Sequence, residues 1–134
     1  MQITRQADYA VRAVLHLAEL NKNGGRAPTS KIASEQHIPP SFLAKIVSQL
    51  SVAGVVQTSR GARGGVSLSR DPSEITLLEV VEAIDGPITI NECVMDPKSC
   101  PFGDNCKVHD IWCTIQKDLV NKLSGTTFAE LAKE

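Results

Sequence analysis

The chain has 134 residues, of which 42% are hydrophobic and 22% are charged, and its formal net charge is −1. This length suits one compact domain and excludes a second large one, and the apolar content excludes a disordered chain. The sequence lacks both a run of roughly 20 apolar residues, which a membrane span needs, and a basic start followed by an apolar run. We therefore expect a cytoplasmic protein without a membrane partner.

The nearly neutral net charge hides a difference between the two halves of the chain. Residues 1–70 contain nine Lys and Arg against three Asp and Glu, whereas residues 71–134 contain five against twelve. Clustered Lys and Arg are the residues that contact phosphates, so we expect only the first half to meet a polyanion. The alternative is two solvated surfaces whose charges differ without consequence.

Three helices are predicted before residue 55. Thr4 is placed to cap the first helix, whose apolar residues recur at i, i+3, i+4 and i+7, and Asn23-Gly24-Gly25 ends it. Thr29 is placed to cap a short second helix, and after a tight turn Pro40 starts a third helix that Gly54 ends. Two helices joined by a tight turn, the second with a small polar face, form a helix-turn-helix pattern. The apolar face of the third helix contains Leu43, Ile46, Val47 and Leu50.

Residues 55–68 predict a β-hairpin. The strands cover 55–59 and 66–68, and the turn between them reads Arg60-Gly61-Ala62-Arg63-Gly64-Gly65. Glycine allows close approach, and arginine fits phosphates or a narrow minor groove. An isolated basic hairpin is usually a solvated turn, but directly after a helix-turn-helix we expect it to be a wing that contacts DNA. The predicted fold is mainly α with a small β-hairpin wing, and residues 1–70 form the winged helix-turn-helix module.

The remaining chain predicts a linker helix in residues 71–90, a cysteine-containing loop in 91–107, and a dimerisation helix with a C-terminal tail in 108–134. The linker helix is closed by Asp85-Gly86-Pro87. The last helix runs from about Lys107 to Ser124 and has an apolar residue at every fourth position. This stripe suits a dimer interface, and the alternative is a core helix within one subunit. It consists of Ile111, Ile115, Leu119 and Leu123.

All four cysteines fall in one stretch, Cys93-x6-Cys100-x5-Cys106-x2-His109-x3-Cys113. Structural disulfides are rare in a reducing compartment, which favours metal binding or redox chemistry. Zinc sites usually contain a pair separated by two to four residues, and none of the cysteine-to-cysteine gaps is that short. Three widely spaced cysteines better suit an inorganic cluster held by thiolates. If the last helix begins by Cys106, then Cys106, His109 and Cys113 share one of its faces.

Several motifs together resemble the IscR/NsrR family of bacterial winged-helix transcription regulators, many of which carry an iron-sulfur cluster. They are Leu50-Ser51-Val52-Ala53-Gly54-Val55-Val56, the Arg60–Gly65 turn and the cysteine group. The resemblance extends from Thr4 to Leu131. It implies a homodimer that binds a palindromic operator in double-stranded DNA. Each subunit presents its third helix to a major groove and its wing to a minor groove.

The resemblance also implies DNA-binding roles. Ser41, Ala44 and Lys45 occupy the base-reading start of the recognition helix, and Arg60 matches an arginine that enters the minor groove, with Arg63 beside it in the wing. Ala44 stands where some IscR-like members have a glutamate that tunes operator choice. An alanine makes no polar base contact and packs only against a thymine methyl, so Lys45 is the better candidate for reading guanine or holding a phosphate.

For the metal site, the resemblance implies that Cys93, Cys100, Cys106 and His109 match the three-cysteine, one-histidine pattern of IscR-like proteins that bind a 2Fe-2S cluster. The first gap is one residue longer than in that pattern. Histidine ligation tends to raise the reduction potential of such a cluster and can make it labile.

Two other fourth ligands stay open. NsrR-like members hold a 4Fe-4S cluster with three cysteines and an aspartate from the partner subunit's first helix, and Asp8 stands at that position. Its place near a helix N-terminus, with Arg12 at i+4, explains this residue fully without ligation, and we favour that explanation. Cys113 is either a fourth thiolate or a small buried residue on the interface helix.

We therefore expect a homodimeric transcription regulator whose operator affinity is controlled by an iron-sulfur cluster, with 2Fe-2S favoured over 4Fe-4S. The alternatives are a winged-helix protein with a structural zinc site and a cluster-carrying interaction protein without regulated DNA binding. The sequence contains no catalytic triad, phosphate loop or acidic metal site. We expect neither an enzyme nor a small-molecule substrate.

Overall fold

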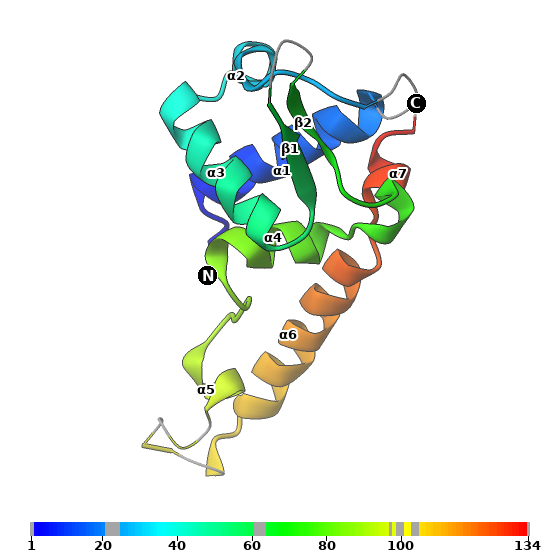
Figure 1. The fold of residues 1–134 in the computed structure, drawn as a ribbon. Coiled ribbons are helices and arrows are strands. Elements are labelled where there is room, and N and C mark those ends of the chain that lie inside the picture. The colour runs from blue at the N-terminus through cyan, green and yellow to red at the C-terminus, as the bar shows by residue number, and fades with distance from the viewer. Residues whose placement is uncertain are drawn as a thin grey trace.

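A computed structural model describes residues 2–20, 25–60, 64–96, 98, 101–102 and 105–133. The described part has a helical head with a β-hairpin, from which a long helix leads away as a stem (Figure 1). This confirms the predicted fold class. No helix in these ranges is long and apolar enough to span a membrane. In chain order the elements are α1 (Arg5–Leu20), α2 (Thr29–Gln36), α3 (Pro40–Val52), β1 (Val56–Ser59), β2 (Gly65–Leu68), the short 3₁₀ helix η2 (Pro72–Glu74), α4 (Leu77–Asp85), α5 (Glu92–Met95), α6 (His109–Ser124) and α7 (Phe128–Leu131).

The first helix, α1, begins as predicted. The Thr4 hydroxyl accepts a hydrogen bond from the backbone N–H of Ala7 at 3.1 Å, which satisfies one of the free donors at the helix start. The same hydroxyl donates to Asp85 Oδ1 at 2.5 Å, at the end of α4. One side chain therefore caps α1 and joins it to α4.

The helix-turn-helix is formed by α2 and α3. The prediction that Thr29 caps α2 is wrong: the helix already includes Thr29, and Pro28 precedes it as the cap without a side-chain hydrogen bond. The reason is that the Pro28 carbonyl accepts from the N–H groups of both Lys31 and Ile32, at 3.1 and 3.2 Å, so the first turn starts one residue earlier. Pro40 starts α3 as predicted, and the four apolar residues of its predicted face are all buried.

The wing consists of β1 and β2, which pair antiparallel from Val56 opposite Leu68 to Ser59 opposite Gly65. Val66 also exchanges two backbone hydrogen bonds with Ala27, at 2.8 and 3.0 Å. This bridge brings the chain just before α2 against the wing. Gly65 has a φ of +154°, and a Cβ there would lie 2.6 Å from the Ala27 carbonyl oxygen. Only glycine allows this close approach.

The hydrophobic core lies in the head and does not stop at residue 70. Ile75, Val80 and Phe128 are fully buried in the same cluster as residues of α1, α2 and α3. The helix α4, predicted as a linker, packs on α1. The division of the chain into a DNA-binding module and a separate linker stays a prediction.

Arg70 connects four parts of the head. Its guanidinium donates to the carbonyl oxygens of Gly54 and Glu74, both at 3.3 Å, and to both carboxylate oxygens of Glu79, including Oε2 at 2.7 Å. The bond to Glu79 raises the pKa of Arg70. The end of the wing is thereby fastened to the turn after α3, to η2 and to α4.

Candidate functional site

The outer surface of α3 presents the residues predicted to read bases. Ser41, Ala44 and Lys45 are all exposed on its first two turns. Phe42, which the sequence analysis did not single out, is 43% exposed between them and lies against Tyr9 of α1, with ring centroids 6.3 Å apart. An aromatic ring on this surface can contact a thymine methyl. A sequence signal for this exposure existed: Phe42 is apolar but does not belong to the spacing shared by the buried residues of α3.

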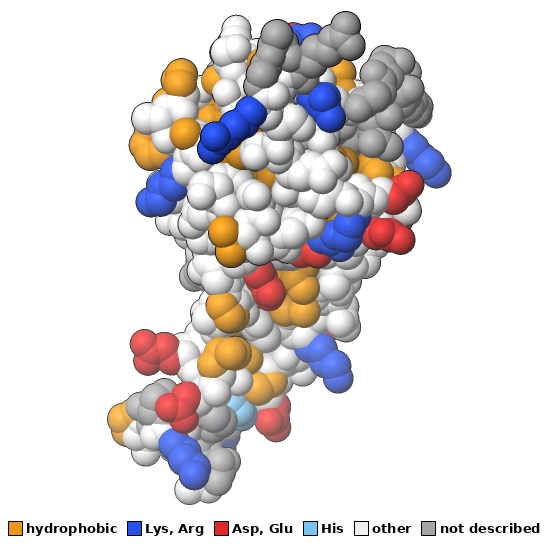
Figure 2. All heavy atoms as spheres, viewed as in Figure 1, with side chains coloured by type: hydrophobic (Ala, Val, Ile, Leu, Met, Phe, Trp, Pro, Cys, Tyr) orange, Lys and Arg blue, Asp and Glu red, His pale blue; other side chains and the backbone are white. Residues whose placement is uncertain are grey.

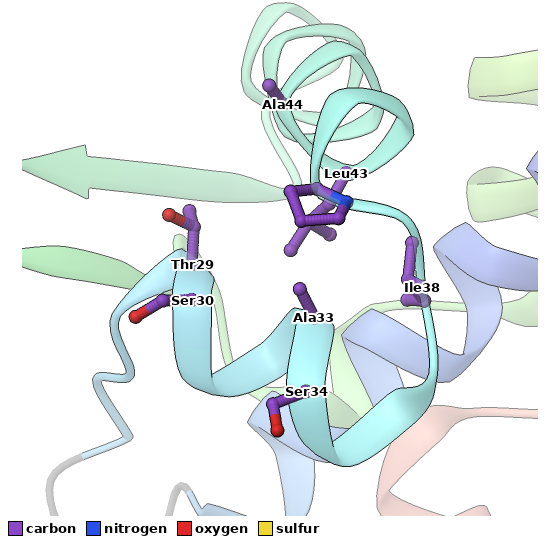
Figure 3. Close-up of a pocket in the computed structure, with 8 residues that line it drawn as sticks. Thr29, Ser30, Ala33, Ser34, Ile38, Leu43 and Ala44 are labelled. Carbon is purple, nitrogen blue, oxygen red and sulfur yellow. The ribbon is translucent and has the colours of Figure 1, made fainter.

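A hollow of about 360 Å³ lies between α2 and α3, next to this surface. In Figure 3, Ala33 of α2 and Leu43 of α3 face each other, whereas the hydroxyl groups of Thr29, Ser30 and Ser34 point away from them. The floor is therefore apolar and the rim carries hydroxyl groups. Hydroxyl groups of this kind commonly donate to phosphate oxygens.

A second hollow, of about 250 Å³, lies between the start of α2 and the wing. Thr29 lines both hollows, and Thr58 and Ser59 of β1 contribute further hydroxyls to the second. The start of α2 thus lies between the recognition helix and the wing. Sequence reasoning missed this arrangement because it depends on the pairing of Ala27 with Val66, which no local pattern announces.

The wing and the head supply the positive charge. Arg60 is exposed at the end of β1, and Arg63, the other predicted wing residue, lies outside the described residues. Figure 2 shows Lys and Arg side chains on the upper head, with most Asp and Glu side chains of this face on the lower head and the stem. On this face, the charge difference between the two halves of the sequence therefore also appears as a basic upper head above a more acidic lower part.

Of the candidate metal ligands, the described cysteines and His109 lie on α5, on the start of α6 and in the turn before it, away from the head. The short helix α5, which contains Cys93, packs beside the first turns of α6 (Figure 1). Within α6, the Cys113 Sγ lies 3.4 Å from His109 Nε2. Cys93, Cys106 and Cys113 are partly buried and form no disulfide, and Cys100 is not among the described residues.

The condition under which Cys106 would share a helix face with His109 and Cys113, a helix that begins by Cys106, is not met. The helix α6 begins at His109, and Cys106 lies in the turn before it, where its carbonyl accepts from the His109 N–H at 3.4 Å. Val108, which has no capping side chain, occupies the N-cap. Only His109 and Cys113 share a face, at i and i+4. In the part of the chain that is described, no three His, Cys, Asp or Glu side chains are grouped as metal ligands.

The donor chemistry nevertheless suits an iron-sulfur cluster. Thiolates and imidazole are the ligands that these clusters take, and the described cysteines are only partly buried. Asp8, the alternative ligand, belongs to α1, where it forms an ion pair with Arg12 at 3.1 Å. This ion pair agrees with the explanation that Asp8 is held by its place near the start of α1 and by Arg12, without ligating a metal.

These features define the class of protein: a helix-turn-helix followed by a two-stranded wing, with a separate helical stem. The family model described as "Rrf2: Iron-dependent Transcriptional regulator" matches residues 3–134. The chain therefore belongs to the Rrf2 family and is a transcriptional regulator, as the resemblance predicted.

Individual relatives agree with this assignment. The chain is 34% identical over 131 residues to the HTH-type transcriptional regulator IscR of Escherichia coli strain K12 / DH10B, covering 98% of this chain and 80% of that protein. The solved structure of CymR (YrzC), the global cysteine regulator of B. subtilis, superposes with a TM-score of 0.82 at 27% identity, covering 98% and 96%. IscR of T. potens has a TM-score of 0.74 at 24% identity, covering 98% and 85%, and this match supports the fold alone. The named relatives are regulators, which confirms that the chain is not an enzyme.

Proposed function

We propose that this regulator is a homodimer whose affinity for a palindromic operator is controlled by an iron-sulfur cluster in each subunit. The observation that carries the proposal is the placement of α5, which contains Cys93, beside the first turns of α6, where His109 and Cys113 are in contact, away from the head. The likeness to IscR supports it. The signal is cluster supply, iron, nitric oxide or redox state.

For DNA binding, we assign α3 to a major groove of double-stranded DNA and the wing to a minor groove. Ser41, Ala44 and Lys45 then contact bases or adjacent phosphates, and Arg60 and Arg63 enter the minor groove. The exposure of the three α3 residues and of Arg60 supports these roles.

For dimerisation, we assign the exposed apolar surface of α6. The predicted stripe divides into two parts: Leu119 and Leu123 pack against the core of their own subunit, whereas Ile111 and Ile115 remain 58% and 44% exposed. Val108 and Trp112 extend the exposed part along the same helix. Exposed apolar residues gathered in this way are typical of protein interfaces.

For the cluster, we assign Cys93, Cys100, Cys106 and His109 as ligands, with Asp8 of the partner subunit and Cys113 as alternative fourth ligands. A 2Fe-2S cluster is favoured over 4Fe-4S because histidine ligation to one iron occurs in 2Fe-2S centres. When bound, the cluster supplies bonds that draw the loop containing these residues together, and its loss releases them.

The stem is joined to the head where a change at the cluster can be passed on. Leu119 and Leu123 contact a small cluster that contains Ala7 of α1, Val81 of α4 and Ile88. A change in the angle of α6 therefore acts directly on α1 and α4, which hold the recognition helix. We propose this junction as the element through which the state of the cluster shifts the heads.

The test is anaerobic reconstitution of the purified protein, followed by iron and sulfide analysis and Mössbauer spectroscopy. Cys93→Ala, Cys100→Ala and Cys106→Ala should each lose the cluster, and Lys117→Ala, at an exposed position of α6, should retain it. Comparing His109→Ala, Asp8→Ala and Cys113→Ala identifies the fourth ligand. Full cluster content in all three loop variants would overturn the proposal. A colourless protein containing one zinc per chain would establish the structural zinc alternative instead.

A further inference from the structure

We propose that Gln116 is a positioning residue that fastens the backbone leading to Cys93 onto α6. The inference rests on the proposed function, because it concerns how the cluster ligands are held. The Gln116 side chain accepts a hydrogen bond from the Ile90 N–H at 2.9 Å and donates one to the Ile88 carbonyl at 2.5 Å. One amide group thus satisfies two backbone groups that lie 26 and 28 residues away in the sequence.

The two hydrogen bonds satisfy backbone groups of a segment that has no regular partners for them. Residues 87–91 belong to no helix or strand, so their backbone groups have no regular partners. Ile88 is buried and Ile90 half-buried, and an unpaired backbone group that is removed from water is costly. A glutamine carries both a donor and an acceptor at the end of a flexible side chain. A glutamate keeps only acceptors and would set a carboxylate against the Ile88 carbonyl oxygen.

The position of Gln116 relates it to the candidate ligands. It lies at i+7 from His109 and i+3 from Cys113, so the three side chains share one face of α6. The segment that it holds continues through Thr89, whose hydroxyl donates to the Asn91 carbonyl at 2.8 Å, into α5 and Cys93. The same face of α6 therefore carries the candidate ligands His109 and Cys113, and also Gln116, which holds the backbone that leads to Cys93.

The segment is also tied to the head. Ile88 packs with Ala7 and Val81 in the cluster that Leu119 and Leu123 contact. Gln116 lies one turn before Leu119. Its hydrogen bonds and these apolar contacts therefore act next to each other to hold residues 88–90 against α6. When the amide is lost, we expect the part after Ile88 to detach from α6 while Ile88 itself stays packed.

The experiment uses the full-length protein without cluster, so that its outcome does not depend on metal loading. Amide hydrogen exchange of residues 88–92 and the alkylation rate of Cys93 by iodoacetamide are measured in the wild type, Gln116→Glu and Gln116→Ala. Asn121→Asp makes the same amide-to-carboxylate change at an exposed position of α6 and is the matched control. Exchange in α1 reports on global unfolding.

We expect Ile90 to exchange about tenfold faster in Gln116→Ala, because a lost hydrogen bond to a part-buried backbone group corresponds to roughly that ratio. Gln116→Glu keeps an acceptor for the Ile90 N–H and loses only the donor to the Ile88 carbonyl, so its increase should be smaller. Cys93 alkylation should rise as well, with α1 exchange unchanged and Asn121→Asp like the wild type. Wild-type values for Ile90 or Cys93 in both Gln116 variants would overturn the inference. A wild type that binds no cluster would overturn the proposed function and leave this anchor to be judged by exchange and alkylation alone.

Discussion

Thr4 illustrates how much of the head depends on single polar groups. Its hydroxyl caps α1 through Ala7 and also donates to Asp85. Thr4→Ala should lower the free energy of unfolding by about 1 kcal/mol, the usual cost of a lost N-cap, because the bond to Asp85 is exposed and the capping bond is only partly buried. Urea denaturation measures the change. Thr4→Ser keeps both bonds and should stay close to the wild type; an equal loss in the serine variant would show that the methyl group, and not the hydroxyl, stabilises this corner.

Gly65 tests the close approach of the wing to the chain before α2. Gly65→Ala should cost about 2–3 kcal/mol, because an alanine Cβ meets the Ala27 carbonyl and the backbone there is unfavourable for any L side chain. Gly54→Ala is the control: φ is also positive, at +77°, but nothing lies within 4 Å of a Cβ. It should cost about 1–2 kcal/mol, the conformational term alone. Thermal unfolding of Gly65→Ala and Gly54→Ala measures the two destabilisations. Equal destabilisation in both variants would contradict the contact with Ala27.

At the scale of elements, Arg70 holds the wing, the turn after α3, η2 and α4 together. A double-mutant cycle of Arg70→Ala and Glu79→Ala should give a coupling energy of about 1 kcal/mol, since the bidentate geometry is favourable but both side chains are about one-third exposed. Arg70→Lys retains the charge and should still lose most of the coupling, because an ammonium cannot reach all four acceptors. A lysine variant as stable as the wild type would show that charge alone matters.

The helix α6 divides into a half that packs on its own head and a half that is exposed. If the proposed dimer uses this surface, Ile115→Lys should convert it to a monomer while leaving the fold of each subunit intact, as measured by analytical ultracentrifugation and far-UV circular dichroism. Lys117→Ala, on an exposed polar position of the same helix, should remain dimeric. Persistence of the dimer in Ile115→Lys would place the interface elsewhere.

At the scale of the whole molecule, local patterns were sufficient for most of the fold. The apolar spacing of α1 and α3, the Pro40 start and the strand–turn–strand pattern of the wing are all short-range signals, and each led to the observed element. The start of α6 was placed too early, because an apolar stripe does not specify where a helix without a capping residue begins. Cys106 consequently lies in the turn before α6 and not in the helix.

Features that depend on distant contacts were not predictable. The pairing of Ala27 with Val66 places the Thr29 hydroxyl beside the wing, and the amide of Gln116 holds a segment that is 26 residues away. Neither residue stands out in its local sequence. The cysteine spacing indicated a cluster, but the choice among His109, Cys113 and Asp8 depends on how two subunits meet and on the loop between Cys93 and Cys106.

The most direct measurement is the affinity of the wild-type dimer for its operator with and without the cluster. Fluorescence anisotropy under anaerobic conditions, at one fixed salt concentration, should give dissociation constants that differ at least about tenfold between the two forms, which corresponds to about 1.4 kcal/mol of coupling. Cys93→Ala should have the cluster-free affinity under both conditions. Equal affinities of the cluster-bound and cluster-free wild type would contradict control of DNA binding by the cluster.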